Sequence, residues 1–385
     1  MTRVAVVHDW LVTYGGSERV LEKVLAMFPH AEIFTLVNFM GDDHDFLRSR
    51  KIHTSFIQRL PFAKKKYRSY LPLMPLAIEQ LDMRGFDVVI SSSHAVAKGV
   101  ITGPDQTHIC ICYSPIRYAW DLQNQYLQEA KLTKGLKSAL ARLVLHKMRI
   151  WDMRTANGVD HFLGISKYIQ RRIRKCYGRD SFLLYPPVDT EEFSPTAQKK
   201  DFYLTASRMV PYKRIPLIIE AFAKTPHRKL RVIGTGPEWD RCKEICPPNV
   251  ELLGFQPHSV LKQNLQDAKA FIFAAEEDFG IVPIEAQACG TPVIAYGRGA
   301  ALETIQGPEH SAPTGVFFFE QTADSINIAI DAFERDLGSI TADACRQNSL
   351  RFSHQVFHDQ FADILRKTCN IDMKAGGAAP VPEHQ

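Results

Sequence analysis

Apolar residues in this chain follow two alternating patterns, short continuous runs and longer stretches in which they recur every three or four positions. The first pattern predicts buried strands, and the second predicts helices with one packed face. In the N-terminal half, the predicted strands are 3–7, 32–37, 88–92, 108–113 and 160–165, and the predicted helices include 20–28 and 137–155. Strands that alternate with helices in this way predict a parallel sheet with crossover helices on its faces.

The second half restarts the same alternation after residues 185–195, where three prolines and several polar residues interrupt the periodicity. Here the predicted strands are 201–206, 229–233, 250–253, 270–274 and 292–295, and the predicted helices are 215–223, 259–268 and 284–289. We therefore predict an α/β fold with a second Rossmann-like sheet. A last helical pattern at 351–368 follows the sheet elements, and we expect it to return to the first domain.

Length and composition set the number of domains. A chain of 385 residues exceeds the size at which one hydrophobic core keeps growing. We predict an N-terminal domain at 1–185, a linker at 186–195, a C-terminal domain at 196–350, a crossover helix at 351–370 and a disordered tail at 371–385. The chain begins with a strand-like run and no secretory signal, and it contains no run of about 18 apolar residues, so we expect a cytoplasmic protein.

Cysteine spacing does not favour a metal site or a disulfide. Cys110 and Cys112 lie in an apolar β-like stretch, and no second pair follows at a spacing suited to zinc. We interpret them as buried apolar residues. The segment Asp43, His44 and Asp45 imitates a metal-binding pair of aspartates, but it lies in a polar, loop-like stretch, so we interpret it as no metal site.

Positive charge is unevenly distributed along a chain whose net charge is +5. Residues 58–68 and 131–149 concentrate Lys and Arg beside aromatic and apolar residues, which is typical of segments that bind anionic surfaces. For 131–149 the alternative is a helix with one buried face and one solvated basic face. Nucleic acid is not an expected partner, because the chain has no zinc finger or RNA-recognition signature.

Two carboxylates, Glu277 and Glu285, lie eight positions apart around a glycine turn that follows the apolar run 270–273. Glu277 then falls at the carboxyl end of a strand and Glu285 in the first turns of a helix. Both would face the crevice where open α/β sheets bind ligands. Buried carboxylates need donors, which the hydroxyls of a sugar or a ribose supply. The alternative is a capped, solvated start of a helix.

Residues 207–214 place cations directly after a predicted strand and before a predicted helix. Arg208 can bind two phosphate oxygens at once, and Lys213 adds a point charge near the helix start. The segment therefore predicts a phosphate-binding site. The alternative is a solvated basic loop.

Glycines mark two further junctions between strands and helices. Gly15 and Gly16 allow the backbone to approach a ligand, although such pairs also serve helix packing alone. Gly234 and Gly236 lack the third glycine and the ribose-binding acid of the dinucleotide motif, so a nicotinamide cofactor is not expected.

His94 follows the predicted strand 88–92, so it should lie at that strand's carboxyl end. A histidine in this position can hydrogen-bond a sugar hydroxyl. The alternative is a histidine that caps the next helix.

Together these features resemble family four retaining glycosyltransferases of the GT-B fold, in which two Rossmann-like domains face each other across a cleft. The resemblance covers nearly the whole chain, and residues 207–214 and 276–285 are its most specific segments. Residues 297–303 look like the family's diphosphate loop, with alanines where a proline often precedes the glutamate. Residues 7–11 and 113–121 look like bacterial mannosyltransferases that build O-antigen, capsule or exopolysaccharide.

The resemblance implies a role for each candidate residue. Arg208 and Lys213 would hold the donor diphosphate, Glu285 the ribose hydroxyls, Glu277 the transferred sugar, and His94 that sugar's primary hydroxyl. Amides of Thr304 or Ile305 would add diphosphate contacts. The implied catalytic residues are His94, Arg208, Lys213 and Glu277, and the implied donor contacts are Gly15, Gly16, Arg208, Lys213, Gly234, Phe255, Glu277, Phe279, Gly280, Ile281 and Glu285.

The resemblance also implies a reaction, namely metal-independent transfer of a hexose with retention of configuration and without a cofactor. We expect GDP-mannose rather than a UDP-sugar as the donor, and a lipid-linked saccharide of surface polysaccharide synthesis as the acceptor. The basic stretches would then hold the enzyme on the inner face of the bacterial cell membrane. The alternatives are a nucleotide-sugar epimerase of the same fold and a nucleotide-sugar-binding protein without catalysis.

Overall fold

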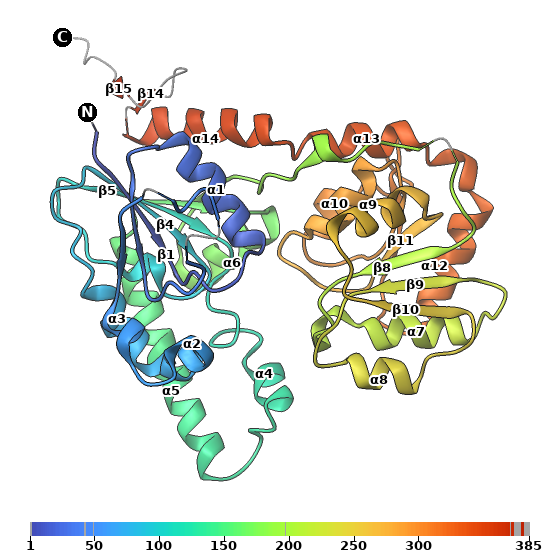
Figure 1. The fold of residues 1–385 in the computed structure, drawn as a ribbon, viewed down its shortest axis with the longest axis horizontal. Helices are drawn as coiled ribbons and strands as arrows, with labels where there is room; N and C mark the ends of the chain where they lie inside the picture. The colour runs from blue at the N-terminus through green and yellow to red at the C-terminus, as the bar shows by residue number, and fades with distance from the viewer. Residues whose placement is uncertain are drawn as a thin grey trace. The chain divides into compact units, whose positions relative to one another are not determined.

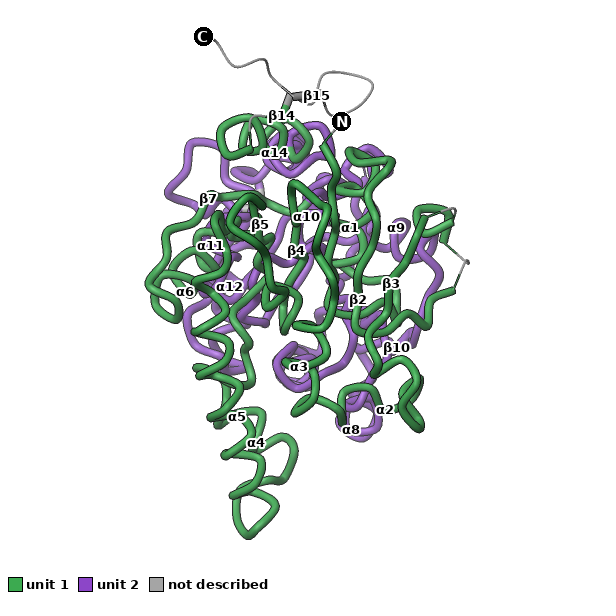
Figure 2. The backbone as a smooth tube through the Cα atoms, turned by 90° about the vertical axis from the view of Figure 1, so that its left-hand side faces the viewer, with its two compact units in different colours: residues 1–186, 357–385 green, residues 187–356 purple. Residues whose placement is uncertain are grey.

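The structure is a computed structural model, and it describes residues 2–41, 44–48, 50–196, 198–369, 371–372 and 379–380. The chain forms two compact units, residues 1–186 with 357–385 and residues 187–356 (Figure 2). The predicted linker at 186–195 is therefore largely part of unit 2, where Val188 and Phe193 are buried. In the segment 43–45, which we interpreted as no metal site, Asp43 lies outside the described residues.

Unit 1 is built on a seven-stranded parallel sheet in the order β3-β2-β1-β4-β5-β6-β7. Figure 1 labels three of its strands, β1, β4 and β5. Its central strands are buried because both faces are covered by helices, as parallel sheets require. The strands are β1 Val4–His8, β2 Glu32–Thr35, β3 Ile52–Thr54, β4 Val88–Ser93, β5 Thr107–Cys112, β6 His161–Gly164 and β7 Ser181–Leu183.

The α-helices of unit 1 are α1 Gly16–Met27, α2 Ala63–Lys66, α3 Met74–Glu79, α4 Gln123–Glu129, α5 Leu136–Thr155 and α6 Lys167–Tyr177. Apolar residues of α3 and α5 share one core with β1, including Ile78, Leu145 and Val7. In both views α4 and α5 extend from one end of the unit (Figures 1 and 2). Cys110 and Cys112 of β5 are buried, as predicted.

Unit 2 has a six-stranded parallel sheet in the order β10-β9-β8-β11-β12-β13. Helices α7 and α12 pack on one face, and α9 and α10 pack on the other. The strands are β8 Tyr203–Ala206, β9 Leu230–Ile233, β10 Val250–Gly254, β11 Ala270–Phe273, β12 Val293–Tyr296 and β13 Gly315–Phe318. The α-helices are α7 Ile215–Ala223, α8 Trp239–Glu244, α9 His258–Asp267, α10 Ile281–Ala288, α11 Ala301–Thr304, α12 Ala323–Arg335 and α13 Ala342–Leu350.

The last long helix, α14 His354–Cys369, begins in unit 2, and its residues from Phe357 onward belong to unit 1. Two short strands, β14 Ile371–Asp372 and β15 Ala379–Pro380, pair antiparallel. The other residues of the predicted tail lie outside the described residues. None of the described helices combines the length and apolar character needed to cross a membrane.

Candidate active site

Each of the two sheets has a topological switch point, which is a pair of neighbouring parallel strands from which the chain continues in opposite directions. In unit 2 this point lies between β8 and β11, and in unit 1 it lies between β1 and β4. The loops that leave such a strand pair diverge, which opens a crevice at the carboxyl ends of the strands. Most of the candidate residues follow these four strands, while Gly234 follows β9 and Phe255 follows β10.

Lys213 and Glu277 meet at the switch point of unit 2. Lys213 ends the short helix Pro211–Lys213 after β8, and Glu277 lies in the loop after β11. Their side chains form an ion pair and are 18% and 13% exposed. The sequence placed both residues at strand ends, and the structure brings them into direct contact.

The backbone of Glu277 is held by the segment that resembles a diphosphate loop. The Ala300 amide donates to the Glu277 carbonyl oxygen at 2.9 Å. Gly299 has a φ of +68°, and a Cβ at this position would lie 2.5 Å from the same oxygen. Only glycine allows this approach without strain. The amides of Thr304 and Ile305, by contrast, donate to the carbonyls of Ala300 and Ala301, so they are not available to a diphosphate as expected.

The second carboxylate, Glu285, lies on α10 and is only 2% exposed. Gly280, with a φ of +86°, is the residue before α10, and Ile281 is its first residue. The helix therefore begins three residues earlier than the predicted start at 284. Phe279 is buried against Phe352 at 5.6 Å between ring centres, so its side chain supports the loop from the core.

Arg208 is exposed at the carboxyl end of β8. Its loop lies against the glycine loop that follows β9, because the amide of Met209 donates to the Thr235 carbonyl at 2.9 Å. Gly234 has a φ of +124°, and a Cβ there would lie 1.9 Å from the Ser207 carbonyl oxygen. Gly234 thus shapes the Arg208 loop through backbone packing.

Phe255 follows β10, at the edge of the same sheet, and is 79% exposed. Its loop joins the neighbouring one through a hydrogen bond of 2.7 Å from the Gly234 amide to the Gly254 carbonyl. An exposed aromatic ring here is free to stack on a planar group.

In unit 1 the switch point is organised by Asp9, which follows β1 and is fully buried. Its carboxylate accepts backbone hydrogen bonds of 2.6–3.0 Å from the amides of residues 94–97. The ring Nδ1 of His94 lies 3.0 Å from Asp9 Oδ2, and 31% of the His94 side chain is exposed. Burial raises the pKa of Asp9, but His94 outweighs it and holds the pKa well below its usual range.

Gly15 and Gly16 begin α1, but the amide of Gly15 already donates to Glu18 Oε2 at 3.0 Å. Glu18 Oε1 lies 3.2 Å from His8 Nε2, and both side chains are buried. His8 Nδ1 in turn lies 3.0 Å from the Ser92 hydroxyl. A buried polar network therefore fixes the glycine loop to β1 and β4.

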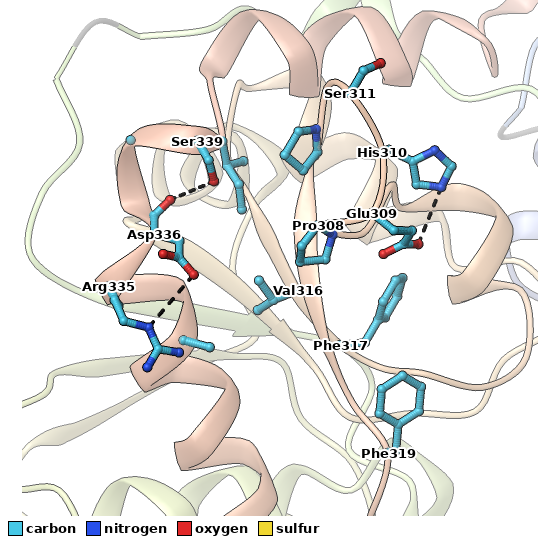
Figure 3. A pocket seen from close by; sticks show the side chains of 14 residues that line it. Pro308, Glu309, His310, Ser311, Val316, Phe317, Phe319, Arg335, Asp336 and Ser339 are labelled. Carbon is cyan, nitrogen blue, oxygen red and sulfur yellow. Dashed lines mark hydrogen bonds and ion pairs between the residues drawn. The ribbon is translucent and has the colours of Figure 1, made fainter.

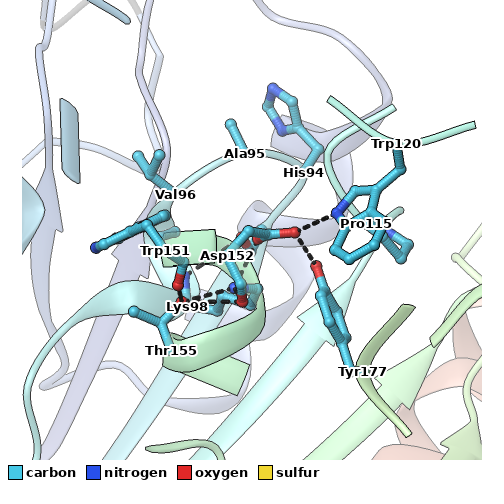
Figure 4. Close-up of polar contacts among 12 residues, drawn as sticks. His94, Ala95, Val96, Lys98, Pro115, Trp120, Trp151, Asp152, Thr155 and Tyr177 are labelled. Carbon is cyan, nitrogen blue, oxygen red and sulfur yellow. Dashed lines mark hydrogen bonds and ion pairs between the residues drawn. The ribbon is translucent and has the colours of Figure 1, made fainter. Parts of the chain in front are cut away.

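A second buried network anchors the residues that follow His94 (Figure 4). The ammonium of Lys98 lies 2.7 Å from Asp152 Oδ1 on α5, and both side chains are at most 2% exposed. Asp152 Oδ2 also accepts hydrogen bonds from Trp120 at 2.7 Å and from Tyr177 at 2.9 Å. Asp152 therefore ties α5 and α6 to the segment that carries His94.

A cavity of about 830 Å³ lies beside β13 in unit 2 (Figure 3). Its wall combines apolar residues such as Phe317 and Phe319 with two local ion pairs, Glu309 with His310 and Arg335 with Asp336. None of the candidate residues lines this cavity. Among the described residues, no group of three or more His, Cys, Asp or Glu side chains is arranged to hold a metal ion.

Asp9, Glu18 and Lys98 are among the residues at these sites to which sequence reasoning assigned no role. Asp9 lies in the segment 7–11, whose resemblance to mannosyltransferases could have marked it as a candidate. Its partners, however, are 85–88 positions away in the chain, and only the pairing of β1 with β4 brings them together.

Residues 189–351 match the model of the family described as "Glycosyl transferases group 1". A GDP-mannose-dependent alpha-(1-6)-phosphatidylinositol monomannoside mannosyltransferase of Mycolicibacterium smegmatis is 27% identical over 212 residues, which are 46% of this chain and 53% of the relative. A GDP-mannose-dependent monoacylated alpha-(1-6)-phosphatidylinositol monomannoside mannosyltransferase of Corynebacterium glutamicum is 31% identical over 178 residues, 38% of this chain and 47% of the relative. The matches thus span about half the length of these relatives.

Solved structures match over nearly the whole chain. Anabaena HepE in complex with UDP aligns with a TM-score of 0.68 at 16% identity and covers 95% of this chain and 100% of its own. Sucrose-phosphate synthase of Thermosynechococcus elongatus aligns with a TM-score of 0.72 at 17% identity, over 95% of this chain and 99% of its own. At such identities the likeness shows the fold alone, and the predicted GT-B fold is confirmed.

Proposed function

We propose that this chain moves a hexose from a nucleotide sugar to a saccharide acceptor. It resembles the family four glycosyltransferases of the GT-B fold, as predicted. The donor we propose is GDP-mannose, the acceptor is lipid-linked, and the anomeric configuration is retained. Residues 189–351 carry the family match, and two relatives that match part of this chain are named as GDP-mannose-dependent mannosyltransferases. The activity of the whole chain remains our proposal.

The observation that carries the proposal is the pairing of Lys213 with Glu277 at the switch point of unit 2. A cation at this position can neutralise the charge that develops on a departing diphosphate, and Arg208, at the carboxyl end of β8, can bind further oxygens. The ion pair keeps the ammonium in place before the donor binds. When a diphosphate binds Lys213 in place of Glu277, the Glu277 carboxylate can accept hydrogen bonds from the hydroxyls of the sugar.

The cations Arg208 and Lys213 replace a metal ion in this scheme. Glu285, buried on α10, accepts hydrogen bonds from the ribose, and His94 from unit 1 contacts the primary hydroxyl of the sugar. Retention follows from attack on the face that the diphosphate leaves, with the leaving phosphate helping to take the acceptor proton. No protein nucleophile is needed for this route.

A thermal-shift panel of nucleoside diphosphates and nucleotide sugars tests the proposal, because a ligand that binds only the folded state raises the melting temperature. We expect GDP and GDP-mannose to give larger shifts than UDP and UDP-sugars. The variant Arg208→Ala should lose the shift. Arg241→Ala, an exposed residue of the same unit, is its control and should keep it.

Measurement of turnover distinguishes sugar transfer from the two alternatives, an epimerase and a binding protein without catalysis. Glu277→Gln should keep the shift with GDP but lose transfer at least about 100-fold, as expected for a group that acts mainly on the transition state. Glu251→Gln, exposed on β10, is the control. An altered free sugar without an acceptor would indicate an epimerase, and binding without turnover would indicate a binding protein. A full shift in Arg208→Ala would refute the phosphate assignment.

We propose in addition that unit 1 associates peripherally with anionic lipid. Lys64, Lys65 and Lys66 of α2 are exposed beside Phe62, which is 75% exposed. On α5, Leu136 and Leu140 are 90% and 63% exposed. Cations next to exposed apolar side chains suit the interface of an anionic membrane, where a lipid-linked acceptor lies.

Vesicle flotation with and without phosphatidylserine tests this association. The wild-type chain should float with anionic vesicles and less so at high salt, while a variant with Gln in place of Lys64, Lys65 and Lys66 should float less. Lys224→Gln together with Lys243→Gln, two exposed lysines of unit 2, is the control. Equal flotation with anionic and neutral vesicles would contradict the proposal, and so would equal flotation of the α2 variant and the wild-type chain.

A further inference from the structure

Asp9 is a buried carboxylate to which the proposed reaction gives no role. Besides its hydrogen bonds to backbone amides, Asp9 contacts one side chain. Its Oδ2 atom accepts hydrogen bonds from the amides of His94 and Ala95 and also lies 3.0 Å from His94 Nδ1. Oδ1 accepts the amides of Val96 and Ala97. One side chain thus holds both the backbone and the ring of His94.

The chemistry of this contact determines which ring nitrogen of His94 carries a proton. An ionised carboxylate has no proton to donate, so the Nδ1 that faces Asp9 must be the donor. In the neutral ring, the far nitrogen, Nε2, is then an acceptor without a proton. Trp10 fixes the ring plane from the side, with an edge-to-face contact of 4.6 Å between ring centres.

We infer that Asp9 is a positioning residue, which holds His94 in the Nδ1–H form so that Nε2 can accept a hydrogen bond from a hydroxyl of the transferred sugar. The inference rests on the proposed function for the identity of the ligand, but its geometry belongs to unit 1 alone. Asp9 acts through His94 and does not itself touch the substrate.

The tautomer can be measured without any assay of activity. In the wild-type chain labelled with ¹⁵N-histidine, the signals of His94 are assigned by their loss in His94→Gln, and we expect the neutral ring to show a proton on Nδ1. His108, whose Nδ1 faces the Gly158 carbonyl at 3.1 Å, is an internal reference for the same tautomer. A neutral His94 with its proton on Nε2, or a ring that carries protons on both nitrogens at the pH of the transfer assay, would overturn the inference.

A double-variant cycle tests the link to transfer. If Asp9 acts through His94, Asp9→Asn should lower kcat about as much as His94→Gln, and the two changes together should cost no more than His94→Gln alone. The shift with GDP should persist in all three. Asp82→Asn, an exposed aspartate of the same unit, should leave transfer unchanged. Additive losses would refute the coupling.

Two failures remain distinguishable. If the wild-type chain transfers no sugar, the proposed function fails while the measured tautomer still decides the role of Asp9. If Asp9→Asn does not fold, because two buried amides lose their acceptor, the wild-type tautomer again decides.

Discussion

His108 illustrates how burial sets the protonation of a single residue. The ring is fully buried and lies 2.8 Å from the Ser91 hydroxyl. The Gly158 carbonyl, 3.1 Å from Nδ1, and the nearby Asp160 favour the charged ring, but burial outweighs both. Burial lowers the pKa of His108 from 6.5 to about 4. The residue therefore stays neutral in the folded chain under conditions in which the unfolded chain binds a proton.

This difference predicts a loss of stability in acid. Between pH 6.5 and about 4 the unfolded chain holds more protons at His108, so the free energy of unfolding falls as the pH falls. The contribution is on the order of 3 kcal/mol over the whole window. Urea unfolding at several pH values should show a shallower dependence in His108→Gln than in the wild type. The same slope in both would contradict the prediction, and His310→Gln, at an exposed site, is the control.

Single residues differ in how far the sequence reveals them. Lys213 and Glu277 each follow an apolar run at a strand end, so local pattern was enough to predict both positions, and the resemblance supplied a role. Their direct contact could not be predicted, because it depends on β8 pairing with β11 across 67 residues, from Tyr203 to Ala270. The role of Asp9 was hidden for the same reason.

Some elements with a strong local pattern were predicted closely, but the amphipathic helices α6 and α12 and several short strands were not predicted. Helix α7 has the predicted bounds, since its apolar face is continuous. Strands β3 and β7 were not predicted, and each is three residues long, lies at a sheet edge and is only partly buried. Strand β13 was also missed, although its four residues are mostly buried.

The connection between α5 and the His94 segment predicts a large effect from one substitution. Lys98→Met leaves the charge of Asp152 buried without its cation, which should cost about 3–5 kcal/mol of the free energy of unfolding. Adding Asp152→Leu should recover part of the loss. Lys367→Met, which removes one partner of an exposed ion pair, should change stability little. Urea unfolding measures all four chains, and equal effects of the two lysine changes would refute the assignment.

For the whole molecule, the sequence predicted two Rossmann-like domains because the same alternation of strands and helices occurs twice, and the two parallel sheets confirm it. The boundary was harder to place. Three prolines suggested a linker at 186–195, yet Val188 binds the Phe352 carbonyl through its amide and packs with unit 2. Proline interrupts periodicity whether a segment is a linker or packs on a domain.

Hydrogen exchange connects the two units to the proposed chemistry. GDP contains the diphosphate but no hexose, so it should slow exchange in the loops of unit 2 at 207–214, 274–280 and 297–303. GDP-mannose should protect these loops and, in addition, residues 93–98 of unit 1, because we propose that His94 contacts the hexose and not the nucleotide. In His94→Gln the added protection of 93–98 should be lost while the loops of unit 2 stay protected. Equal protection of 93–98 by GDP and GDP-mannose would show that His94 does not recognise the hexose, and protection of neither unit would remove the basis for a nucleotide-sugar donor.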